Sequence, residues 1–223
     1  MQFLTSNTTI FIILTLTLCK TSFGQPERLI NRKISEIKKA GVDTIITFYE
    51  FEGRPSYRIK DKYVIGASIY IFWKENSSYL AIKASDYYDT LAINVYDTLF
   101  RVVRLDNLEA YKYLADNLDI ISKQELKVGL IKDQINGKDS LIEVKYSDES
   151  IVIIEVYIGR RKFEKRIRSS QLDNGVILNL DGSLRFKRKS INYDYNINSS
   201  VYKLYALLNA AVADLESKGA FHD

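Results

Sequence analysis

Glu50 and Glu52 are the two carboxylates whose spacing best suits catalysis. They lie in the stretch DTIITFYEFE, whose β-branched and aromatic residues are typical of a strand. In a strand, residues two apart point to the same face, with Cα atoms roughly 6–7 Å apart. Two carboxyl groups can share the acid and base steps of glycoside hydrolysis, so the pair permits a hydrolase. The simpler interpretation, which the sequence favours, places both glutamates and Phe48 on the solvent-exposed face of the strand, with Tyr49 and Phe51 pointing into the core.

Basic residues gather in two segments, GRRKFEKRIR at 159–168 and LRFKRK at 184–189. The first also contains Lys165 and a single acidic residue, Glu164. The candidate contacts for an anionic partner are Arg160, Arg161, Lys162, Arg166, Arg168, Arg185, Lys187 and Arg188. If the segments are neighbours, they form a basic ribbon able to hold phosphorylated lipid, acidic polysaccharide or an acidic protein. The sequence favours the alternative, a charged edge strand that blocks edge-to-edge pairing.

The residues on which most enzyme classes depend are scarce. His222 is the only histidine and lies one residue from the C-terminus, where chains usually fray. We therefore expect no histidine-based triad, general base or metal site. Motifs for dinucleotides, phosphates, zinc and calcium are missing from the sequence, so no cofactor or metal is expected. A formal net charge of +4 over 223 residues is too small to argue for nucleic acid.

Trp73 is the single tryptophan. It follows Ile69 and Ile71 at a period of two, so we expect it to end an inward-facing row in the core. Stacking on a sugar or a protein partner is the alternative, because tryptophan is enriched at such contacts. Most of the 16 tyrosines are interpreted as strand residues with a buried ring and a wet hydroxyl.

Three helices are predicted, at about 26–40, 107–122 and 200–217. The first begins with proline and is followed by Gly41, which can form a left-handed cap. The second carries a pair resembling a capping box at its start, with Asp106 as the cap. The third has apolar residues at intervals of three and four throughout its length.

Between these helices the apolar period changes to two, which predicts strands. DTIITFYEFE is one strand and residues 57–73 contribute two more, after which KENSS turns the chain into YLAIKA. LIEVKYS, SIVIIEVYI, KFEKRIRS and VILNLD predict an antiparallel meander, and LRFKRKSINYDYNI predicts a further strand or two. Strands grouped between helices predict an α+β fold, with an antiparallel sheet packed against N-terminal, central and C-terminal helices. We expect one domain over 25–223, with a two-lobe division near 124–139 as the alternative.

Residues 1–24 predict a signal peptide. The run IFIILTLTL is too short to cross a bilayer, which needs about 20 apolar residues. Ser22 and Gly24 place small residues at positions −3 and −1 of a cut before Gln25. The ending SFGQ resembles the signal peptides of Bacteroidota envelope proteins, and this resemblance covers only the leader. Two alternatives stay open, lipidation at Cys19, which lacks a preceding small residue, and a segment that is not cleaved.

Cleavage after Gly24 leaves a mature chain without cysteine, so neither disulfides nor thiolate chemistry is expected. The implied location is periplasmic or extracellular, with no transmembrane helix in the mature chain. The leading hypothesis is a non-catalytic binding or structural module, for which the basic ribbon is the candidate contact with an anionic envelope component. The alternative is a carboxylate-dependent hydrolase acting on envelope sugar or peptidoglycan.

Overall fold

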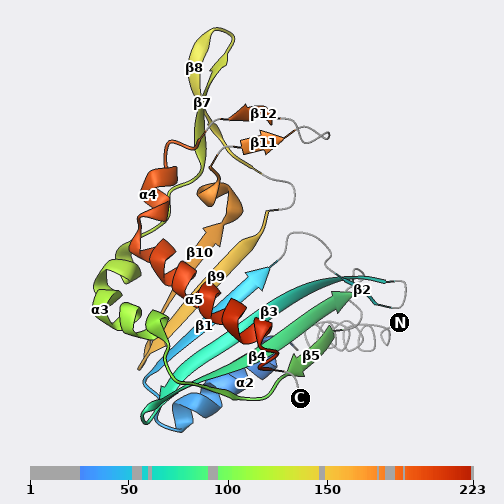
Figure 1. The fold of residues 1–223 in the computed structure, drawn as a ribbon, viewed down its shortest axis with the longest axis vertical. Helices are drawn as coiled ribbons and strands as arrows, with labels where there is room; N and C mark the ends of the chain where they lie inside the picture. The colour runs from blue at the N-terminus through green and yellow to red at the C-terminus, as the bar shows by residue number, and fades with distance from the viewer. Residues whose placement is uncertain are drawn as a thin grey trace, which may run out of the picture.

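A large antiparallel sheet forms the centre of the computed structural model (Figure 1). The structure describes residues 26–51, 57–59, 62–89, 95–145, 149–174, 176–178, 184–187 and 189–221. The eight strands of the sheet are β1 (Thr44–Phe51), β2 (Tyr57–Ile59), β3 (Lys62–Glu75), β4 (Ser78–Asp89), β5 (Val95–Leu99), β6 (Val103–Leu105), β9 (Ile151–Ile158) and β10 (Arg161–Arg168). Their order is β10-β9-β1-β3-β4-β5, with β2 beside β3 and β6 beside β4. The predicted α+β fold with an antiparallel sheet is confirmed.

Helices cover both faces of this sheet. They are α2 (Pro26–Lys39), α3 (Glu109–Lys123), α4 (Tyr193–Ile197) and α5 (Ser200–Ser217), with a 3₁₀ turn, η1 (Ser169–Leu172), after β10. The three predicted helices are therefore present, and Ser199 caps α5 by accepting a hydrogen bond from the backbone N–H of Tyr202. Two details were wrong. Leu108 rather than Asp106 precedes α3. The segment LRFKRKSINYDYNI, predicted as a further strand or two, has a strand at Leu184–Lys187 but ends in the helix α4.

The helix α2 packs on one face of the sheet. Its isoleucines Ile30, Ile34 and Ile37 form a buried cluster with Trp73 and other side chains of β1, β3, β4 and β9. Trp73 is 4% exposed, so the prediction that it ends a core row is confirmed. The tryptophan ring therefore stabilises the contact between α2 and the sheet.

The helices α3 and α5 pack on the opposite face, as Figure 1 shows. Phe48 is fully buried there, together with Ile46 and the α5 leucines Leu204 and Leu208. The prediction of a wet face for Phe48 was wrong because helices cover both sides of β1. A period of two cannot distinguish the faces of a strand that is buried on both sides.

Two small sheets lie at one end of the molecule (Figure 1). One pairs β7 (Leu130–Ile135) with β8 (Lys138–Glu143), and the other pairs β11 (Val176–Leu178) with β12 (Leu184–Lys187). The predicted meander is therefore divided, with only β9 and β10 in the large sheet. Asn136 and Gly137 both have positive φ, which suits a two-residue hairpin and turns β8 back onto β7.

Candidate functional site

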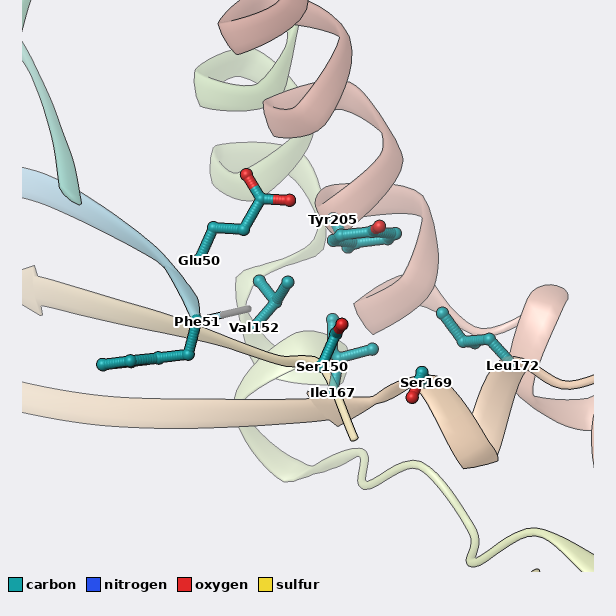
Figure 2. Close-up of a pocket in the computed structure, with 8 residues that line it drawn as sticks. All are labelled: Glu50, Phe51, Ser150, Val152, Ile167, Ser169, Leu172 and Tyr205. Carbon is teal, nitrogen blue, oxygen red and sulfur yellow. The ribbon is translucent and has the colours of Figure 1, made fainter. Parts of the chain in front are cut away.

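A pocket opens where three strands of the large sheet end beneath α5 (Figure 2). Its volume is about 300 Å³. It is lined by Glu50, Phe51, Ser150, Val152, Ile167, Ser169, Leu172 and Tyr205. We call this cavity the β1–α5 pocket. Figure 2 shows Glu50 and Tyr205 beside each other near α5, Val152 and Ile167 beneath them, and Phe51 pointing away from the other seven.

The strand register places the base of this pocket. Glu50 of β1 pairs with Val152 of β9, and Val152 pairs with Ile167 of β10. The three side chains therefore form a row across the sheet on the face that α5 covers. The neighbouring row begins with Phe48, which is fully buried. Glu50 is thus the first polar residue of β1 beyond the core, and it is half-buried.

Tyr205 forms the wall that α5 contributes. Its ring stacks near Phe48, with the two ring centroids 6.2 Å apart. Burial raises the pKa of the Tyr205 phenol, and the negative charge of Glu50 raises it further. The phenol is therefore protonated at neutral pH and carries a hydroxyl that can donate or accept a hydrogen bond.

The lining combines one charge, three hydroxyl groups and an apolar base. Glu50 is the only charged side chain among the eight, and Ser150, Ser169 and Tyr205 supply the hydroxyls. A cavity of 300 Å³ is at the lower end of the range for small-molecule pockets, about 300–1,000 Å³. The composition therefore suits a small molecule with one apolar side and at least one hydrogen-bond donor.

Only one glutamate of the predicted carboxylate pair, Glu50, lines the described part of this pocket. Glu52 lies outside the described residues, and Glu50 is the one carboxylate among the described side chains that line the pocket. A glycoside hydrolase of the usual kind needs two carboxyl groups roughly 5–10 Å apart across the scissile bond. The described part of the pocket does not provide that arrangement.

The first basic segment forms β10, an edge strand of the large sheet. Lys162 lies 2.6 Å from Glu155, Arg168 lies 3.6 Å from Glu149, and the neighbouring Arg166 pairs with a glutamate on its own strand. These charges are neutralised within the protein. The position at the edge of the sheet agrees with the interpretation of β10 as a strand protected by charge.

The other two arginines of this segment are adjacent, with Arg160 in the turn between β9 and β10 and Arg161 as the first residue of β10. Arg160 and Arg161 are exposed, and neither forms an ion pair within the described ranges of the chain. The second basic segment lies in a different sheet, because β12 pairs with β11 rather than with β10. The side chains of Arg185 and Lys187, and the whole of Arg188, lie outside the described residues.

Lys165 was counted in the basic segment, but the structure gives it another place. Its side chain is 2% exposed and points toward the end of α3. Its Nζ donates to the carbonyl oxygens of Ser122 at 3.0 Å and Gln124 at 2.8 Å, and to the carboxylate of Glu125. A buried cation at a helix C-terminus satisfies carbonyls that the helix leaves unpaired. Lys165 is therefore structural.

A buried carboxylate that the sequence did not single out lies on the α2 side of the sheet. Glu155 accepts hydrogen bonds from the hydroxyls of Tyr157 at 2.8 Å, Tyr49 at 3.1 Å and Thr47 at 3.3 Å, and from Lys162 at 2.6 Å. Burial would raise the pKa of Glu155, but the hydrogen bonds from Lys162 and Tyr157 lower it below its ordinary value. The only signal in the sequence was one glutamate within the apolar run SIVIIEVYI.

This Glu155 cluster holds the sheet together. Burial and the carboxylate together raise the pKa of both Tyr49 and Tyr157, so both phenols stay protonated and donate. Four donors from β1, β9 and β10 saturate the two oxygens of Glu155, which leaves little capacity for a ligand. We therefore assign the cluster a structural role and keep the β1–α5 pocket as the candidate site.

The described residues contain no group of three or more side chains placed to hold a metal ion. No helix in the described ranges is both long and apolar enough to cross a membrane. No protein-family model, curated protein or solved structure matches the chain.

Proposed function

We propose that this chain is an exported, non-catalytic module that binds a small ligand in the β1–α5 pocket. The observation that carries the proposal is the lining, in which one carboxylate and three hydroxyls face aliphatic side chains across about 300 Å³. Pockets of this kind gain affinity from apolar contact and orient the ligand with a few polar groups. Export is supported by the leader, with Gly24 and Gln25 at the expected cut, all of which lie outside the described residues.

The polar groups of the described lining support a non-catalytic role. Hydrolysis of a sugar or peptide requires a second acid or base, or an activated nucleophile. None of the described residues that line the pocket is a histidine that could activate Ser150 or Ser169, and the single histidine of the sequence, His222, lies outside the described residues. Glu50 alone can hold a ligand through hydrogen bonds without completing such a reaction.

The test is an NMR titration with 2-phenylethanol, a neutral probe with an apolar ring and one hydroxyl. The methyl groups of Val152, Ile167 and Leu172 report on the pocket, and those of Ile30 and Ile34 beneath α2 serve as an internal control. We expect saturable shifts confined to the first set, at millimolar probe concentrations typical of a small ligand. Shifts spread equally over both sets, or none at all, would rule out the pocket as a binding site.

Two tryptophan variants give the matched control. Ser150→Trp fills the mouth of the pocket from an exposed position, while Ser217→Trp adds the same ring at an exposed position near the end of α5. The first should abolish the shifts and the second should leave them unchanged. Equal binding by both variants would show that the probe occupies another surface.

A second candidate function uses Arg160 of the β9–β10 turn and Arg161 at the start of β10 to hold an anionic partner. The observation that favours it is the exposed pair Arg160 and Arg161, which has no ion-pair partner in the described part of the chain. Electrostatic binding of this kind weakens with salt. The neutralised arginines Arg166 and Arg168 offer a comparison on the same strand.

The comparison uses vesicles containing anionic phosphatidylglycerol and the double variants R160S/R161S and R166S/R168S. If the turn holds the anionic surface, the first variant should lose more binding than the second at low salt. Equal losses would assign the attraction to general charge, and unchanged binding of R160S/R161S would end this candidate.

A further inference from the structure

We infer that the ligand of the β1–α5 pocket carries a positively charged ammonium group beside an apolar body. This inference rests on the proposed function and adds the chemical class of the ligand. Its basis is the charge of the lining. Of the eight lining side chains one is charged, and it is the carboxylate of Glu50. A ligand with a negative group would meet this charge at close range, whereas a cation would be attracted to it.

The charged residues next to the pocket in the described part of the chain do not reverse this preference. Glu149 precedes the lining residue Ser150, and Arg168 precedes the lining residue Ser169. The two neighbours form an ion pair with each other, with Arg168 Nη1 3.6 Å from a carboxylate oxygen of Glu149. Their charges largely cancel, so Glu50 carries the one charge that lines the described part of the pocket.

Glu50 is placed to receive an ammonium group. The side chain is half-buried, between Val152 of β9 and Ser68 of β3 in the strand register, so its charge is less screened than that of a fully exposed glutamate. A carboxylate has about four acceptor sites, so Glu50 can accept from a ligand while it keeps an interaction within the protein. The ring of Tyr205 lies beside it (Figure 2), and an aromatic face also attracts a cation.

The rest of the pocket suits an apolar body. Val152 and Ile167 are 8% and 2% exposed and form the base, and Leu172 of η1 forms a side wall. A ring or branched chain resting on these side chains would be removed from water, which favours binding in proportion to the apolar area buried. Charge at one end and apolar surface at the other define an amphipathic amine.

Three probes of similar size test this inference by NMR titration of the intact mature chain. They are 2-phenylethylammonium, neutral 2-phenylethanol and anionic 3-phenylpropanoate, followed through the methyl groups of Val152, Ile167 and Leu172. We expect the ammonium to bind about tenfold more tightly than the alcohol, since a charge-assisted hydrogen bond is roughly twice as strong as a neutral one. The carboxylate should bind most weakly.

The matched variants are Glu50→Gln, which removes the charge and keeps the shape, and Glu164→Gln, which removes a charge on the opposite face of β10. Glu50→Gln should reduce the preference for the ammonium over the alcohol to less than about threefold, and Glu164→Gln should preserve it. An unaltered preference in Glu50→Gln would overturn the inference. Binding of the alcohol as tightly as the ammonium would overturn it too, but would leave the proposed pocket intact. If none of the three probes shifts the methyl groups, the pocket itself is wrong.

Discussion

The Nζ of Lys165 lies 2.8 Å from the carbonyl oxygen of Gln124, so a lysine of the edge strand closes the end of a helix. The same nitrogen also reaches the carbonyl of Ser122. This contact joins β10 to α3 on the face of the sheet that α5 also covers. It shows that the most basic segment of the chain contributes to the core as well as to the surface.

Lys165→Met should destabilise the protein by about 2 kcal/mol, because it leaves two helix carbonyls without their donor in a buried position. Arg166→Met, next along the same strand and exposed, should leave the free energy of unfolding almost unchanged. Urea denaturation of both variants provides the measurement. Similar stabilities would mean that the Lys165 contacts do not hold α3.

Glu155→Gln should also destabilise the fold, by about 1–3 kcal/mol. The amide cannot accept all the hydrogen bonds that the carboxylate accepts, and it leaves Lys162 without its counter-ion. Glu164→Gln, at the paired position on β10, serves as the control because its partner Arg166 is exposed. If the two variants unfold at the same urea concentration, the Glu155 cluster contributes nothing specific.

The Glu155 cluster also predicts how stability depends on pH. Although burial opposes ionisation, the hydrogen bonds from Lys162 and Tyr157 hold the pKa of Glu155 below its ordinary value of 4.5. The ionised group therefore stabilises the folded state above pH 4.5, and this contribution is lost as the pH falls through the folded-state pKa. Between neutral and acidic pH, wild type should lose more unfolding free energy than Glu155→Gln. Parallel curves for the two proteins would contradict the assignment.

Phe221 anchors the segment that follows α5. It is 2% exposed, and its ring lies 5.9 Å from that of Tyr70, centroid to centroid. Phe221→Ala should destabilise the protein by about 3 kcal/mol, as expected for a buried aromatic side chain. Ile120→Ala, at a position that is 54% exposed, should change stability by less than about 0.5 kcal/mol. Thermal unfolding of both variants will show whether the segment after α5 is packed against the core or frayed.

Export predicts the mass of the native protein. A soluble species that begins at Gln25 is expected in the periplasmic or extracellular fraction, because small residues at 22 and 24 suit cleavage before it. Intact-mass spectrometry of soluble and membrane fractions provides the measurement. A membrane species that begins at an acylated Cys19 would instead establish a lipoprotein.

The fold was predictable where local patterns decide it. Apolar residues spaced three and four positions apart predicted the three long helices. The spacing of two between Ile69, Ile71 and Trp73 predicted a row of core residues. The order of the strands was not predictable, since β1 lies between β3 and β9 through pairings distant in sequence. The sequence interpretation placed Phe48 and Glu50 on a solvent-exposed face of their strand. That placement was wrong because helices cover both faces of β1.

The candidate site was predictable only in part. Glu50 was identified as a carboxylate of interest, but its partner in the pocket, Tyr205, comes from a helix 155 positions further along the chain. The roles of Lys165 and Glu155 depend on contacts across strands and helices, which charge patterns alone do not reveal. A lysine in a basic run and a glutamate in an apolar run look the same whether they are buried or exposed.

A crystal structure of residues 25–223 with 2-phenylethylammonium would show where the amine binds and what its nitrogen contacts. We expect the ring against Val152 and Ile167, with the nitrogen about 2.7–2.9 Å from a carboxylate oxygen of Glu50, the usual length of a charge-assisted hydrogen bond. The amine bound elsewhere, or bound in the pocket with its nitrogen directed away from Glu50, would contradict this expectation.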